Sequence, residues 1–114
     1  MKVETIKGTT VGFYDGTITS ESDALDAIGA TYGLDIDLVV LDVERMADDF
    51  FWLSSGLAGA ALQKFQNYGL RVAIVGDISR FTHESPSLRD FVYETNKRGQ
   101  MLFLPDSAAL EARL

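Results

Sequence analysis

The residues with the greatest potential for chemistry lie together in the stretch Asp49–Ser55, which reads D-F-F-W-L-S-S. Its two hydroxyls directly precede an alanine- and leucine-rich run that predicts a helix. A serine at a helix start accepts a hydrogen bond from an unpaired backbone N–H group. A phosphoserine at the same place would be favoured by the positive end of the helix. Ser54 and Ser55 are therefore either helix caps or phosphate acceptors, and the sequence leaves both interpretations open.

Three consecutive aromatic residues, Phe50, Phe51 and Trp52, follow Asp49 in this stretch. They cannot all face one core, so at least one ring is expected to be partly exposed. Exposed aromatics beside acids are typical of protein interfaces. Asp49 and the three aromatics are thus candidate interaction residues. The alternative is a hydrophobic staple that fixes the entry of the chain into the following helix.

A second set of candidates forms a possible ligand rim where predicted strands end. Asp42 and Asp77 each lie at or just past the end of an apolar run, and Ser79 follows closely. Ligands of open α/β sheets bind outside the carboxyl ends of the strands. Arg89 joins the set because a cation in the first turn of a helix opposes the helix dipole and needs a specific acceptor. The alternative is that the acids cap helices and solvate loops, while Arg89 forms a salt bridge.

Catalytic and cofactor motifs are absent. The only histidine, His83, has no G-x-S-x-G nucleophile elbow to serve, and no glycine-rich phosphate-binding motif is present. The acids match no metal-binding spacing. We therefore expect no catalytic residue, no metal and no cofactor.

The hydrophobic pattern predicts five strands and four helices. The strands are expected at 3–6, 10–14, 38–41, 70–75 and 101–104, with Lys7-Gly8 as the turn of an opening hairpin. Helices are expected at about 22–33, 56–68, 86–98 and 107–114. In the first helix, Leu25, Ile28 and Tyr32 are predicted to form the buried stripe. The run Leu38–Leu41 has no polar alternation, which is typical of a strand covered on both faces.

The order β-β-α-β-α-β-α-β-α predicts an α/β fold. An opening hairpin followed by alternating strands and helices gives a mixed sheet whose later strands are parallel. With 114 residues and no linker or repeat, residues 1–114 are expected to form a single domain.

Composition narrows the possible partners. Lys and Arg number 10 against 17 Asp and Glu, a net charge of −7, which disfavours nucleic acid and anionic membrane surfaces. The chain has no cysteine, and no apolar run is long enough for a membrane span. We therefore expect a cytoplasmic protein with no nucleic-acid or membrane partner.

The stretch Asp49–Phe65 follows the pattern D-F-F-x-L-x-x-G-L-A-G-x-x-L-Q-K-F. This pattern resembles an uncharacterised bacterial family catalogued as domain of unknown function 4180. Further similarity lies in A-I-V-G-D at 73–77 and S-L-R-D-F at 87–91, so the resemblance covers roughly the last two-thirds of the chain. The activity of that family is not known.

The core of the chain, Leu38–Gly76, is also similar to STAS domains, the family of anti-sigma-factor antagonists. There, a strand ending in Leu-Asp is followed by a D-S-S-G-L motif that opens a helix. Here Leu41-Asp42 precede S-S-G-L, with Leu53 in place of the aspartate. The resemblance implies a STAS-like fold and a motif serine that a partner kinase phosphorylates to control partner binding. Ser55 is the residue so implied, with Ser54 beside it.

Together these patterns favour a non-enzymatic regulatory or protein-interaction module of STAS-like fold. Its partner would be another protein or a second copy of the chain in a homo-oligomer such as a dimer. The alternative is a small-molecule-binding protein or small enzyme that uses the acidic rim at the strand ends.

Overall fold

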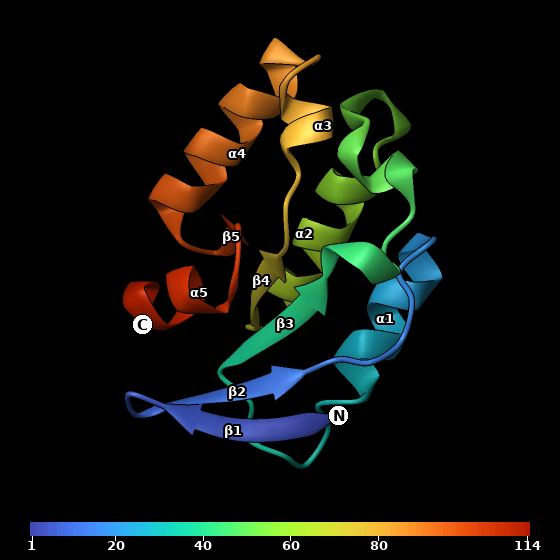
Figure 1. Cartoon of the computed structure of the whole chain (residues 1–114). Helices are drawn as coiled ribbons and strands as arrows, with labels where there is room; N and C mark the ends of the chain where they lie inside the picture. The colour runs from blue at the N-terminus through green and yellow to red at the C-terminus, as the bar shows by residue number, and fades with distance from the viewer.

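The strands form one five-stranded mixed sheet in which spatial order follows chain order, β1-β2-β3-β4-β5. A computed structural model describes all residues, 1–114 (Figure 1). The strands are β1 (Lys2–Ile6), β2 (Thr9–Phe13), β3 (Leu38–Asp42), β4 (Arg71–Val75) and β5 (Met101–Leu104). The helices are α1 (Glu21–Gly29), α2 (Leu57–Asn67), α3 (Ser79–Thr82), α4 (Pro86–Arg98) and α5 (Ser107–Arg113). Three short 3₁₀ helices, η1 (Val43–Arg45), η2 (Asp48–Phe51) and η3 (Leu53–Ser55), lie between β3 and α2.

The hairpin and the parallel strands confirm the predicted α/β fold. β1 and β2 pair antiparallel around Lys7 and Gly8, which both have positive φ, 50° and 82°. This is the backbone that a tight hairpin turn requires, and glycine adopts it without steric cost. β2, β3, β4 and β5 then pair in parallel. Each parallel step needs a crossover, and α1, α2 and α4 supply them.

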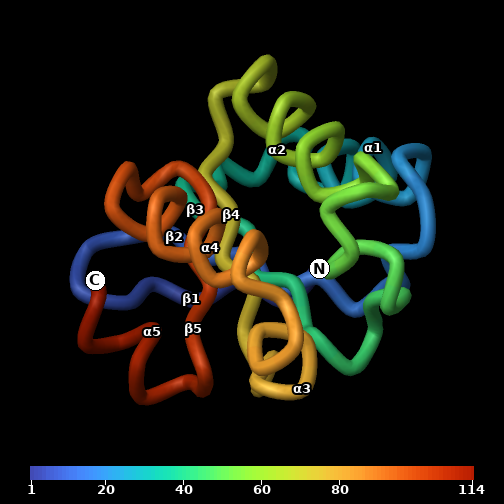
Figure 2. The backbone as a smooth tube through the Cα atoms, turned by 90° about the horizontal axis from the view of Figure 1, so that it is seen from above, coloured from blue at the N-terminus to red at the C-terminus, as the bar shows by residue number.

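The two faces of the sheet are covered unequally. On one face, α1, α2 and α4 pack over alternate strand residues, including Val39, Leu41 and Ile74, in a cluster of 20 buried residues. On the other face, only α5 packs on the sheet, and Leu110 joins a cluster of 6 buried residues. Figure 2 shows α1 and α2 lying together, well apart from α5. β3 is thus covered on both faces, which confirms the prediction from its unbroken apolar run.

Side chains cap the starts of three helices. The hydroxyl of Ser20 accepts from the Asp23 N–H group and begins α1, and the Asp106 carboxylate accepts from Ala109 at the start of α5. Ser85 caps α4 through the Leu88 N–H group, with Pro86 following in the first turn. Side-chain caps of this kind satisfy backbone donors that a helix start leaves free.

The buried stripe predicted for the first helix is wrong. Leu25 and Tyr32 are exposed, Tyr32 at 92%, and the buried residues of α1 are Ala24, Ala27 and Ile28. The helix ends at Gly29, so Tyr32 lies beyond it in a turn. Small alanine side chains are buried instead, in the same cluster as Ala58 and Ala61 of α2. No helix of the structure has the length and apolarity to cross a membrane.

Candidate functional site

The stretch singled out from the sequence lines one side of a surface hollow of about 450 Å³. We call it the loop hollow. Its other side is the segment from α3 to the start of α4. Its lining residues are Phe51, Trp52, Leu53, Ser54, Arg80, Phe81, Glu84, Ser85 and Ser87. In Figure 1, α3 and the first turns of α4 lie at the top of the molecule, beside the segment that precedes α2. The fold therefore brings together two loops that are distant in sequence.

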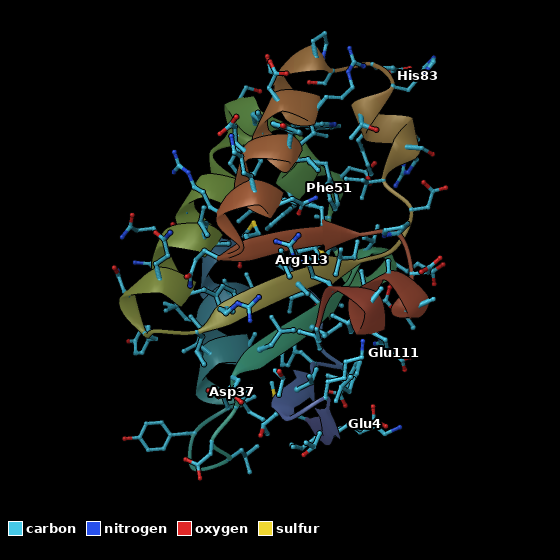
Figure 3. All side chains as sticks on the ribbon, turned by 90° about the vertical axis from the view of Figure 1, so that its left-hand side faces the viewer. Glu4, Asp37, Phe51, His83, Glu111 and Arg113 are labelled. Carbon is cyan, nitrogen blue, oxygen red and sulfur yellow. The ribbon has the colours of Figure 1, made fainter.

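The three consecutive aromatics divide between the core and the surface. Phe50 and Phe51 are 0% and 2% exposed, whereas Trp52 is 55% exposed. The Phe51 ring stacks on Phe81 with centroids 4.6 Å apart and contacts the edge of Phe50. Figure 3 shows Phe51 in the interior, beneath the surface side chains. Neither phenylalanine is available for direct contact with a partner, and both hold the segment that presents Trp52.

Arg80 joins the two sides of the loop hollow. Its guanidinium lies 4.1 Å from the centroid of the Phe81 ring and donates to the Asp48 carboxylate at 2.9 Å. Both charged side chains are largely exposed, so this ion pair contributes little to overall stability. Its geometric effect is to tie η2 to α3 beside the aromatic stack.

Ser55 and Ser54 differ in their hydrogen bonds. The Ser55 hydroxyl donates to the Asp49 carbonyl oxygen at 2.6 Å and accepts from the Leu57 N–H group at 3.2 Å. It therefore ties the 3₁₀ segment to the first residue of α2. The intervening Gly56 has a φ of 77°, which glycine adopts readily. Ser54 is exposed, its hydroxyl makes no hydrogen bond to the rest of the protein, and it lines the loop hollow.

The residues of the predicted ligand rim lie in separate places. Asp42 accepts from the Glu44 N–H group at 2.9 Å and lines a different hollow, near β1 and α5. Asp77 and Ser79 line a third hollow of about 250 Å³. Arg89 donates to the carbonyl oxygens of Thr82 and His83, at 2.6 and 3.3 Å, so its acceptor is the end of α3 and not the expected carboxylate. No three acidic or histidine side chains gather closely enough to hold a metal ion.

Three side chains have shifted pKa values, two through local hydrogen bonds and one through burial. The Ser79 N–H group, which donates to Asp77 Oδ1 at 2.8 Å, lowers the pKa of that carboxyl below 3.8. Hydrogen bonds from Thr19 lower the pKa of Asp23 in the same way. Burial, with a smaller effect of the Asp26 carboxylate, raises the pKa of the Tyr14 phenol above 10.0. Both acid shifts stabilise the charged form, as expected for carboxylates that organise backbone.

Sequence reasoning missed the half of the loop hollow contributed by the α3–α4 segment. Phe81 gave no signal of its own, because α3 is only one turn, and Ser85 and Ser87 indicated only the start of a helix. The one available hint was an aromatic residue within a polar loop, where a ring usually packs on something distant. Its packing partner, Phe51, could be identified only in three dimensions.

A second feature is an apolar surface at the other end of α1 and α2. Leu25, Tyr32 and Tyr68 are all exposed and line one hollow of about 510 Å³. Large apolar side chains that gather in this way are uncommon on a monomer surface and are typical of contact sites.

The fold defines a small α/β domain with a mixed five-stranded sheet. The family described as domain of unknown function (DUF4180) matches residues 5–114, nearly the whole chain. The chain belongs to this family. No curated protein and no solved structure gives a significant match.

Proposed function

We propose that this domain is a non-enzymatic regulatory module that binds a protein partner through the rim of the loop hollow. The observation that carries the proposal is the exposure of Trp52 on a rigid support. Tryptophan is among the residues most enriched at the energetic centres of interfaces. Trp52 directly follows the buried Phe51, whose ring stacks on the partly buried Phe81, so the backbone at Trp52 is fixed before a partner arrives. A fixed aromatic loses little conformational entropy on binding.

The lining of the loop hollow suits a peptide or protein surface. The hydroxyls of Ser54 and Ser87, the carboxylate of Glu84 and the guanidinium of Arg80 line the hollow together with the rings of Trp52 and Phe81. A partner that inserts an apolar side chain and offers backbone polar groups would match this arrangement. The rings of Trp52 and Phe81 would supply the area buried on binding, and the polar side chains would supply hydrogen bonds, as in the usual anatomy of an interface.

We further propose that phosphorylation of Ser55 switches this surface, as the resemblance to STAS domains suggests. A kinase would transfer a phosphoryl group from ATP to the Oγ atom, which loses its proton. The modified oxygen could no longer donate to the Asp49 carbonyl, so the bond at 2.6 Å would be lost. The added charge would be favoured at the start of the 11-residue helix α2 and repelled by the carbonyl oxygen. Trp52, which lies between the two bonded residues, would change its position.

The test of partner binding is site-specific photo-crosslinking in the cells that encode the protein. A photoreactive phenylalanine analogue replaces Trp52 in one variant and Tyr93 in a control, because Tyr93 is an exposed aromatic on α4 outside the loop hollow. We expect a defined crosslinked protein from position 52 and not from position 93. The same products from both positions, or none from either, would contradict the proposal.

The test of the switch is phosphopeptide mapping of protein recovered from the same cells, with Ser54→Ala and Ser55→Ala variants in parallel. We expect phosphate on the wild-type segment, its loss in the Ser55→Ala variant and its retention in the Ser54→Ala variant. Phosphate retained at position 54 when Ser55 is replaced would move the switch to Ser54. An unmodified segment under all growth conditions would contradict the switch while leaving the partner proposal intact.

Self-association is a second proposal, supported by the apolar surface around Tyr32 and Tyr68. A twofold contact there would remove three exposed hydrophobic side chains from water on each chain. Sedimentation velocity should show a dimer for the wild type and a monomer for a Tyr32→Ser, Tyr68→Ser variant. A wild-type monomer at high concentration would contradict this proposal.

A further inference from the structure

The sheet face that α5 covers only in part carries a second hollow, of about 370 Å³. We call it the strand-end hollow. Its lining residues are Lys2, Phe13, Tyr14, Asp15, Val40, Asp42, Arg45, Val75, Ser107 and Leu110. The volume lies within the usual range for small-molecule sites. Figure 3 shows this face, with Glu111 on α5 and Glu4 on β1 marking the two elements that flank it.

Strand register places the floor of this hollow on one face of the sheet. Lys2 pairs with Phe13, Phe13 with Val40, and Asp42 with Val75. Because side chains alternate along a strand, Val40 and Asp42 point to the same side. Four neighbouring strands thus contribute to one surface at the carboxyl ends of β2, β3 and β4. This is where open α/β sheets bind ligands.

The floor is apolar and the rim carries both signs of charge. Val40 and Leu110 are buried members of the smaller core cluster, and Phe13 and Val75 pack against it. Lys2 and Arg45 supply two cations, and Asp15 and Asp42 supply two carboxylates. A ligand with a single charge would meet a like charge as well as an opposite one. A ligand with one positive charge, one negative charge and an apolar side chain would interact favourably with the cations, the carboxylates and the apolar floor.

Two of these charged groups are already held in place. Arg45 Nη1 donates to the Asp15 carbonyl oxygen at 2.8 Å, which leaves the other guanidinium N–H groups for a ligand. One oxygen of Asp42 accepts from the Glu44 N–H group, which leaves its other oxygen. Lys2 has only a weak, exposed pairing with Glu4 at 3.6 Å. Groups fixed before binding lose less entropy when the ligand arrives.

We propose that the strand-end hollow binds a free α-amino acid with an apolar side chain. The carboxylate of the ligand would pair with Arg45 and Lys2, and its ammonium with Asp42. Its side chain would lie on Val40, Val75 and Leu110. This site is independent of the partner surface at the loop hollow, because the two share no lining residue.

Isothermal titration calorimetry of the whole chain with L-leucine, L-phenylalanine and L-serine tests the proposal. We expect saturable binding of leucine and phenylalanine, with serine weaker by about tenfold or more because it lacks the apolar body. N-acetyl-L-leucine and L-leucinamide each lack one charge and are expected to bind about tenfold or more weakly than leucine. If N-acetyl-L-leucine bound as tightly as L-leucine, the ligand would be a peptide C-terminus, and the proposal of a free amino acid would be overturned. No saturation by leucine or phenylalanine at millimolar concentration would overturn the site.

Matched variants locate the binding. Arg45→Met and Asp42→Asn should each weaken the binding of leucine by about tenfold or more. Arg98→Met and Asp90→Asn, the same changes on α4, should leave the binding of leucine unchanged. Because Arg45 also holds the Asp15 carbonyl, Lys2→Met serves as a cation variant without that contact. Thermal unfolding of each variant confirms that it is folded. Leucine binding that survives all three hollow variants would overturn the assignment.

Discussion

The loop hollow and the strand-end hollow are built in opposite ways. The loop hollow lies between segments whose polar groups are mostly engaged in holding the backbone, as Ser55, Ser85 and the Arg80–Asp48 pair show. The strand-end hollow is a product of register, because alternate residues of four paired strands meet on one face. A surface made of loops depends on local bonds that a modification can break. A surface made of strands is as rigid as the sheet, which suits a small ligand of fixed shape.

The largest expected loss of stability is at Phe51, the buried residue that holds Trp52 in place. Phe51→Ala removes a ring that is 2% exposed and stacks on Phe81, so it should lower the free energy of unfolding by about 3–5 kcal/mol. Trp52→Ala, one residue further on, should cost less than about 1 kcal/mol because its ring is half exposed. Chemical denaturation of the two variants measures both. Equal losses would mean that the stack does not support the loop.

The next test concerns Gly76. It directly follows Val75, the last residue of β4, which lines the strand-end hollow. Its φ is 144°, and a Cβ atom there would lie 2.7 Å from Val43 Cβ. Gly76→Ala should therefore lower the free energy of unfolding by about 1–3 kcal/mol. Gly59→Ala, in open space on α2, should instead raise it by about 0.5–1 kcal/mol through helix propensity. A neutral Gly76→Ala variant would show that Val43 moves aside freely.

The hydrogen bonds of Ser55 contribute less to the free energy of unfolding than the two features above, but they belong to the loop hollow alone. Ser55→Ala loses the acceptor for the Leu57 N–H group and the donor to the Asp49 carbonyl, at a cost of about 1 kcal/mol. Ser54→Ala should change stability by less than about 0.5 kcal/mol. Urea unfolding curves of the two variants make the comparison. A larger loss at position 54 would reverse the roles assigned to the two serines.

The smallest expected effect is the pH dependence contributed by Asp77. Its pKa in the folded state lies below the ordinary 3.8, because the Ser79 N–H group bonds to the carboxylate. A depressed pKa contributes stability above the unfolded value, and this is lost as the pH falls through the folded pKa. Wild type should therefore be slightly more stable than Asp77→Asn at neutral pH, and the two should converge in acid. Denaturation at pH 7 and in acid measures the difference, and a constant gap would contradict it.

The same contrast explains what could be predicted from the sequence. The order of the five strands and of α1, α2, α4 and α5, the hairpin turn at Lys7-Gly8 and the double burial of β3 follow from local patterns, and the structure confirms them; the one-turn helix α3 was not predicted. Tyr32 was placed in the stripe of α1 because its spacing fits a helix, but the helix ends at Gly29 before that spacing applies. Within the loop hollow, local motifs indicated only Asp49–Ser55 in advance. Of the strand-end hollow, the sequence indicated only Asp42, as a residue at a strand end. The other residues of that hollow, and the partners across the gap of the loop hollow, depend on long-range pairing that no local pattern encodes.

Trp52 is the only tryptophan of the chain, so its fluorescence reports on the loop hollow alone. The most direct test of the account is to titrate the partner identified by crosslinking at position 52 while recording this emission. We expect a saturable shift to shorter wavelength as the half-exposed indole is covered, and no shift on addition of L-leucine, which belongs in the other hollow. A complex that forms without any change in Trp52 emission would contradict the claim that this rim is the partner-binding surface.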